Sequence, residues 1–112
     1  MSKRLRNLFQ FNQPSPAEKQ TWRQKIEPVS GRAFELARER WQRNAPLDEK
    51  EIAEASRLRE QLLAFAEELT RQPALHREMA SQISEGLLDT AYAISAPPAT
   101  SLRLHHFIES RA

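Results

Sequence analysis

The chain has 112 residues, with 17 Lys and Arg against 15 Asp and Glu, no cysteine, and 39% hydrophobic residues. The length suits one domain, and the lack of cysteine excludes a disulfide scaffold and a thiolate metal site. No apolar run approaches the ~20 residues that a membrane-spanning helix needs, so we expect no integral membrane segment.

The first 14 residues form a basic and apolar arm, which we separate from a helical domain at 15–95. Its cations are Lys3, Arg4 and Arg6, and its large apolar residues after Met1 are Leu5, Leu8, Phe9 and Phe11. Polar residues interrupt the apolar ones, which excludes a secretory signal and leaves a mitochondrial transit peptide as the rival interpretation. We expect a cytoplasmic protein.

Two short helices are predicted after the arm. Ser15, Pro16 and Glu18 have the order of a capping box with proline at the first helical position. Pro28 is expected to end this first helix near Glu27, because the proline ring clashes with the preceding turn. Ser30 then offers the N-cap of a second helix, which fades at Asn44.

A long helical hairpin is predicted over residues 49–95. Asp48 to Glu51 resembles a capping box, and neither glycine nor proline interrupts 49–72. Apolar residues three and four apart form a coiled-coil-like seam, namely Ala55, Leu58, Leu62, Phe65 and Leu69. Pro73 can open the next helix, whose apolar stripe contains Met79, Ala80, Ile83, Leu87, Ala91 and Ile94. Gly86 lies inside this stripe, where the close approach of another helix would explain it.

These patterns predict an all-α fold. We expect a small helical bundle in which two short N-terminal helices pack on a long antiparallel hairpin, with N- and C-terminal extensions.

Residues 96–112 are predicted as a separate C-terminal tail behind the stiff Ala96-Pro97-Pro98 linker. Ser101 could cap a short helix that carries Leu104, Phe107 and Ile108. Equally, Leu102, Leu104 and His106 could line one face of an added strand. The helical middle holds much alanine, and its core would be marginal alone. Each tail therefore either folds back to complete the core, docks onto a partner, or stays disordered.

Charge is unevenly divided along the chain. Residues 1–45 carry ten Lys and Arg against four Glu, whereas 46–95 carry five against ten acids. A basic half of this kind is typical of contact with phosphates, and the candidates for a nucleic acid are Lys3, Arg4, Arg6, Lys19, Arg23 and Arg40. Pairing of the arginines with Glu35, Glu39 and the acidic hairpin is the competing interpretation.

Catalytic chemistry is missing from the sequence. His76, His105 and His106 lack the spacing of a metal pair, and there is no glycine-rich phosphate loop or nucleophile elbow. We therefore expect no enzyme, no metal site and no cofactor.

The leading hypothesis is a non-catalytic protein-interaction protein: an accessory subunit, adaptor or regulator of a larger assembly. It would bind a protein partner through its apolar tails and helical surface, at Leu8, Phe9, Phe11, Leu104, Phe107 and Ile108. Self-association through the outer edge of the hairpin is an open possibility. The alternative is a nucleic-acid-associated helical subunit that uses the basic N-terminal half.

Overall fold

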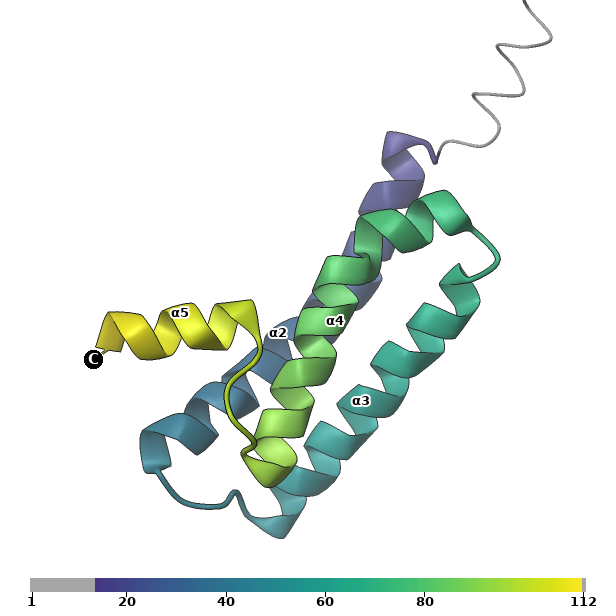
Figure 1. Ribbon diagram of the computed structural model, residues 1–112. Coiled ribbons are helices and arrows are strands. Elements are labelled where there is room, and N and C mark those ends of the chain that lie inside the picture. Colours follow the sequence, from purple (N-terminus) through teal and green to yellow (C-terminus); the bar gives the residue numbers. More distant parts are fainter. Residues whose placement is uncertain (1–13, 112) are drawn as a thin grey trace, which may run out of the picture.

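The computed structural model describes residues 14–111, which form four packed α-helices (Figure 1). These helices are α2 (Pro16–Arg43), α3 (Glu49–Leu69), α4 (Pro73–Ser95) and α5 (Leu102–Arg111). Residues 14–111 contain no strand, so the predicted all-α class is confirmed for this part of the chain. Residues 1–13, which make up nearly all of the predicted arm, lie outside the described residues.

The prediction of two short N-terminal helices is wrong. Residues 16–43 form one continuous helix of 28 residues, with Pro28 inside it. Pro28 and Gln24 are both exposed, so water can bond the Gln24 carbonyl that the missing N–H of proline leaves free. Ile26 and Ser30, on either side of the proline, are both buried. Packing of this inner face keeps the helix continuous through a residue that costs about 3 kcal/mol in an isolated helix.

The predicted N-cap role of Ser30 is wrong for the same reason. Ser30 lies in the middle of α2, where its hydroxyl donates to the carbonyl of Glu27 at 3.4 Å. The same hydroxyl accepts a hydrogen bond from Nε2 of Gln82 on α4 at 3.3 Å. A residue expected to begin a helix therefore joins two helices.

The ends of the other helices follow the local signals in the sequence. Asp48 and Glu51 form a complete capping box at the start of α3, and Pro73 occupies the first turn of α4. Asn44 and Ala96 adopt left-handed backbone conformations, with φ of 49° and 48°, and end α2 and α4. The backbone N–H of each of these caps bonds a carbonyl of the preceding turn.

Helices α2, α3 and α4 pack on one another around two groups of buried side chains. The first group lies toward the α3–α4 turn and consists of Trp22, Ile26, Leu62, Leu69, Leu75, Met79 and Ile83. The second lies toward the α2–α3 loop and consists of Ala33, Leu36, Leu47, Ala55, Leu58 and Ala93. The second group contains three alanines, which brings the helices close together at that end.

Gly86 lies where α4 approaches both α2 and α3 closely. A β-carbon at this position would lie 2.8 Å from Cδ1 of Leu62 on α3 and 3.3 Å from Cβ of Ser30 on α2. The predicted reason for this glycine, close approach of another helix, is confirmed. Gly31 is different, because a β-carbon there would meet no atom within 4 Å.

The C-terminal segment forms a helix that folds back onto the bundle. Helix α5 contacts α2 and α4, and α4 stands between it and α3 (Figure 1). Of the two conformations left open for this segment, the structure has the helix with Ser101 as its cap.

Candidate functional site

Helix α5 is held in place by an acidic side chain from another helix. The Glu85 carboxylate on α4 accepts hydrogen bonds from the backbone N–H groups of Leu102 at 3.0 Å and Arg103 at 3.2 Å. The Ser101 hydroxyl donates to the same carboxylate at 2.6 Å and accepts from the backbone N–H of Leu104 at 3.3 Å. Glu85 and Ser101 together satisfy three of the free N–H donors at the start of α5.

These contacts control the ionisation of Glu85. Burial alone would raise the pKa of this carboxyl, but the hydrogen bonds from Ser101, Leu102 and Arg103 outweigh it and lower the pKa below the usual 4.5. Glu85 is therefore charged at neutral pH. A negative charge at the N-terminus of α5 also interacts favourably with the helix dipole.

Arg103 links α5 to both of the helices that it contacts. Its Nη2 donates to the Ser30 carbonyl on α2 at 2.9 Å and to Oδ2 of Asp89 on α4 at 3.2 Å. Asp89 is completely buried, and its Oδ1 has no hydrogen-bond partner among residues 14–111. Burial raises the pKa of Asp89 above its usual value, and Arg103 offsets only part of this effect.

Aromatic rings from α2 and α5 meet beyond this polar contact. Phe107 makes edge-to-face contacts with Phe34 and Trp41, with ring centroids 6.1 Å and 5.6 Å apart. Three arginines approach these rings. The guanidinium carbon of Arg103 lies 4.8 Å from the centre of the Phe34 ring, and those of Arg111 and Arg38 lie 5.6 Å and 6.0 Å from that of Phe107.

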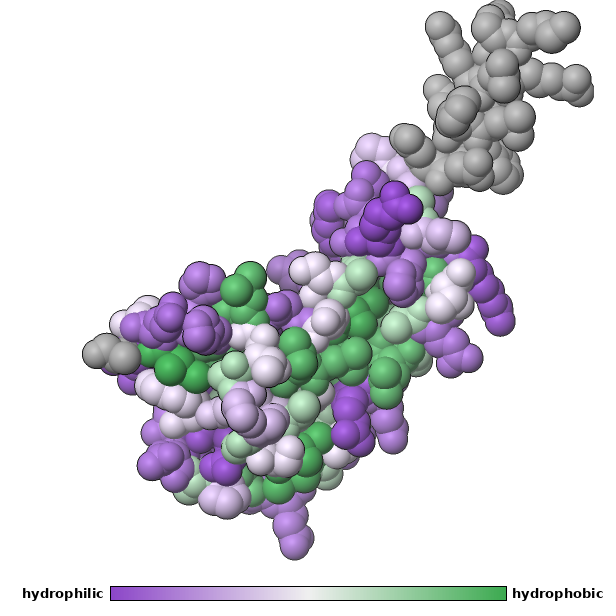
Figure 2. All heavy atoms as spheres, in the orientation of Figure 1, coloured by the Kyte–Doolittle hydropathy of each residue, from purple (hydrophilic) through white to green (hydrophobic). Residues whose placement is uncertain are grey.

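A shallow and mostly apolar groove opens at this cluster. We call it the α5 groove, and its lining residues are Phe34, Leu102, Arg103, His106, Phe107 and Ser110. Leu102 is 60% exposed, which makes it one of two large hydrophobic residues between 14 and 111 that are mostly exposed. Figure 2 shows hydrophobic surface on α5 and along α4, bordered by hydrophilic side chains. Beside the α5 groove, Arg38 and Arg111 have no carboxylate within 4 Å among the described residues.

The structure places the predicted partner-binding residues in different environments. Leu104 is completely buried and belongs to the packing of the chain itself, so it offers no surface to a partner in this conformation. Phe107 and Ile108 are half-buried, and Phe107 lines the α5 groove. The predicted contacts Leu8, Phe9 and Phe11 lie outside the described residues.

The predicted nucleic-acid-binding residues do not gather in one place. Lys19 and Arg23 lie near the start of α2, and both approach Glu78 of α4, at 3.3 Å and 3.8 Å. Arg40 lies 17 residues beyond Arg23, which corresponds to about 25 Å along a helix. The other candidates, Lys3, Arg4 and Arg6, lie outside the described residues.

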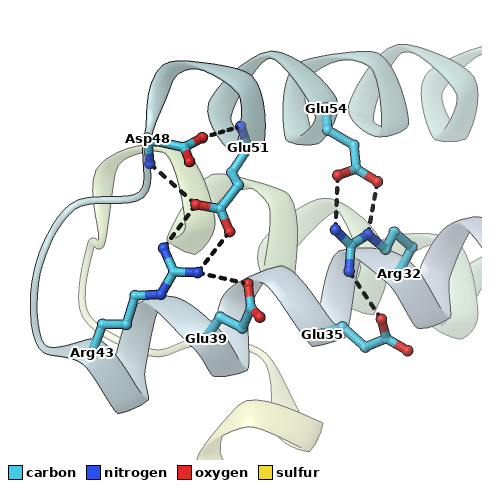
Figure 3. A network of polar contacts seen from close by, with 7 residues as sticks. All are labelled: Arg32, Glu35, Glu39, Arg43, Asp48, Glu51 and Glu54. Atoms are coloured by element: carbon cyan, nitrogen blue, oxygen red, sulfur yellow. Dashed lines mark hydrogen bonds and ion pairs between the residues drawn. The ribbon is translucent and has the colours of Figure 1, made fainter.

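Two further arginines of α2 are occupied by glutamates of α3 (Figure 3). Arg32 makes a bidentate contact with Glu54, at 2.7 Å and 2.9 Å, and also reaches Glu35 at 3.1 Å. Arg43 makes a bidentate contact with Glu51, at 2.7 Å and 3.0 Å. The Arg43 guanidinium lowers the pKa of Glu51 to about 2.

The competing interpretation of the charges therefore holds for Arg32 and Arg43. Glu39 pairs with Arg43 within α2, as its spacing predicts. Glu35 pairs with Arg32, three residues before it. The Arg38 side chain lies beside Phe107.

Sequence reasoning missed Glu85, Asp89 and Arg103 as the residues that position α5. The available signal was the four-residue spacing of the two acids, which puts both on one face of α4 next to Gly86. An acid on the buried side of a helix needs a donor. The sequence does not reveal that this donor comes from residue 103.

No three His, Asp or Glu side chains between residues 14 and 111 lie close enough to hold a metal ion. No helix in this range is both long and apolar enough to cross a membrane.

Comparisons of the chain with protein-family models, with curated proteins and with solved structures found no match.

Proposed function

We propose that this chain is a non-catalytic protein-interaction subunit that binds a protein partner at the α5 groove. The observation that carries the proposal is the exposed Leu102 beside an aromatic cluster with arginines around it. An adaptor or accessory subunit of a larger assembly acts through a surface of this kind.

The composition of the groove supports this proposal. Aromatic residues and arginine are enriched at the centres of protein interfaces, where they account for much of the binding energy. Phe34, Phe107 and Arg103 line the α5 groove, and Arg38 and Arg111 lie beside its Phe107 ring. Covering the Leu102 side chain would remove its apolar surface from water, which contributes up to ~2 kcal/mol.

The way in which α5 is attached also supports the proposal. Glu85, Ser101 and Arg103 fix the start of the helix through five hydrogen bonds to α2 and α4. A surface that is already ordered loses less conformational entropy when it binds. The predicted contacts of Leu8, Phe9 and Phe11 remain part of the proposal, as a second contact.

Site-specific photo-crosslinking in the cells of origin tests the proposal. Benzoylphenylalanine is introduced in place of Leu102 and, as a matched control, in place of the exposed Gln24 on the solvent side of α2. We expect a nuclease-resistant protein adduct from position 102 and none from position 24. The proposal is overturned if position 102 gives no protein adduct, or gives the same adducts as position 24.

Nucleic-acid binding is the second candidate function, and the same cluster favours it. Rings beside arginines, such as Phe107 with Arg38 and Arg111, are the elements on which single-stranded nucleic acids stack. Affinity for a labelled single strand should fall with salt, and Arg38→Gln with Arg111→Gln should flatten the slope. Arg43→Gln is the control, because Glu51 already neutralises Arg43. Binding that does not depend on salt would rule this candidate out.

A further inference from the structure

Two exposed leucines lie in opposite charge environments. Leu102 is 60% exposed and lies in the α5 groove near arginines. Leu63 on α3 is 51% exposed and has Glu60 three residues before it and Glu67 four residues after it. Residues at these spacings share one face of a helix. We call the face formed by Glu60, Leu63 and Glu67 the α3 stripe.

The α3 stripe is negative where the α5 groove is positive. All three of its residues are exposed, and no salt bridge within residues 14–111 involves Glu60 or Glu67. The last turn of α3 contains no basic residue, so no cation within the helix offsets the negative end of its dipole. Arg59 is the one cation beside Leu63 on the same face, one turn before it.

A single molecule cannot bring its own stripe onto its own groove. Helix α5 packs on α2 and α4, and α4 stands between it and α3 (Figure 1). The stripe of one molecule therefore reaches a groove only on another molecule.

We propose that the partner at the α5 groove is a second copy of this chain, whose α3 stripe lies in the groove. This inference rests on the proposed function and names its partner. Leu63 of one copy packs against Leu102 and Phe107 of the next. Glu60 and Glu67 then face Arg38 and Arg111, the two arginines beside the groove that have no carboxylate within 4 Å among the described residues.

The contact joins two different surfaces, so it is head-to-tail. Each added copy places its stripe in the groove of the previous copy and leaves its own groove free, so the assembly grows beyond two chains unless it closes into a ring. A contact of one leucine with a shallow groove and two pairs of opposite charges supports a weak interface, with a dissociation constant of about 10 µM to 1 mM.

Analytical ultracentrifugation of the purified full chain tests the inference. The average mass of the wild-type protein should rise with concentration above the 13.0 kDa of one chain and fall when salt is added. Leu63→Gln and Leu102→Gln leave the net charge unchanged, and each should weaken association about tenfold or more.

Mixing the two variants gives the decisive measurement. The Leu63→Gln protein keeps an intact groove, and the Leu102→Gln protein keeps an intact stripe. At a concentration at which the wild type associates and neither variant does so alone, the mixture should form a complex of two chains and stop there. Gln61→Ala, an exposed change on α3 next to the stripe, is the control and should associate like the wild type.

Three results would overturn the inference. The first is a wild-type protein that stays monomeric up to about 1 mM, the upper end of the range for a weak interface. The second is loss of association only in Leu102→Gln, which indicates groove-to-groove contact. The third is a mixture that stays monomeric although both variants are folded by circular dichroism. If one of these results is found and position 102 still crosslinks to a protein other than this chain, the proposed function stands and this inference fails.

Discussion

Arginine is used in different ways where α2 meets α3 and where α2 meets α5. At the junction of α2 and α3, Arg32 and Arg43 make bidentate contacts with Glu54 and Glu51, and their charges are neutralised within the chain (Figure 3). At the junction of α2 and α5, Arg38 and Arg111 lie against the Phe107 ring. No carboxylate of the described residues lies within 4 Å of either arginine.

This difference separates contacts made for the fold from a surface open to other molecules. An arginine held by two carboxylate oxygens of its own chain has little left to offer a partner. An arginine over an aromatic ring keeps most of its N–H donors available. The basic composition of the N-terminal half is therefore a poor guide to function until each cation is assigned its contact.

The largest expected effect comes from Leu104, which anchors α5 from inside. Leu104→Ala leaves a cavity at a completely buried position and should lower the stability of the docked helix by about 2–4 kcal/mol. The matched control is Leu102→Ala, two residues earlier and 60% exposed, which should change stability by less than about 0.5 kcal/mol. Hydrogen exchange at the α5 amides measures both. Equal protection in the two variants would contradict the docked position of α5.

A smaller effect is expected when glutamate is replaced by glutamine at the start of α5 and at the junction of α2 and α3. Glu85→Gln weakens the cap of α5 and should cost about 1–2 kcal/mol of unfolding free energy. Glu54→Gln breaks a pair whose side chains are 32% and 38% exposed, and should cost less than about 1 kcal/mol. Urea denaturation at pH 7 measures the free energy of unfolding of both variants. A larger loss in Glu54→Gln than in Glu85→Gln would contradict the expected order of the two contacts.

The pH dependence of the Glu85 contact has a defined sign. Because the folded protein lowers the pKa of Glu85 below 4.5, its stabilisation is present above that pH and is lost as the pH falls further. The difference in free energy of unfolding between the wild type and Glu85→Gln should therefore shrink as the pH falls below 4.5. A gap that stays constant down to about pH 3 would contradict this assignment.

The smallest expected effect is that of Asp89, whose contribution to stability changes with pH in the opposite direction to that of Glu85. Burial raises the pKa of Asp89 above 3.8, so the folded state holds this proton more tightly and loses stability as the pH rises through the raised pKa. Asp89→Asn lacks this loss. It should be more stable than the wild type at pH 7 and similar to it near pH 3. Denaturation curves at the two pH values measure the difference, and a variant that is less stable at pH 7 would contradict the assignment.

Local signals predicted much of the framework correctly. The capping box of Asp48 and Glu51, the proline that opens α4 and the end of α2 at Asn44 all depend on neighbours within four residues. Pro28 shows the limit of such signals. Its local effect is to break a helix, but the buried residues on either side of it decide the outcome.

The candidate site was less accessible to sequence reasoning. Phe107, one of the predicted contact residues of the tail, lines the α5 groove, whereas Leu104 from the same set is buried. Phe34, which was not among the predicted contact residues, also lines the α5 groove. Which side of α5 faces solvent depends on Glu85 and Arg103, and both act across helix boundaries.

The sequence by itself determined the all-α class, most helix ends and the uneven division of charge, because each depends on spacing along one chain. Only the tertiary structure decided which charges remain without a partner. Residues 1–45 looked like one basic surface. Packing assigns Lys19, Arg23, Arg32 and Arg43 to acids on α3 and α4, and leaves Arg38 beside an exposed apolar groove. Coulomb interactions act through space, and contacts between residues distant in sequence exist only once the helices have packed.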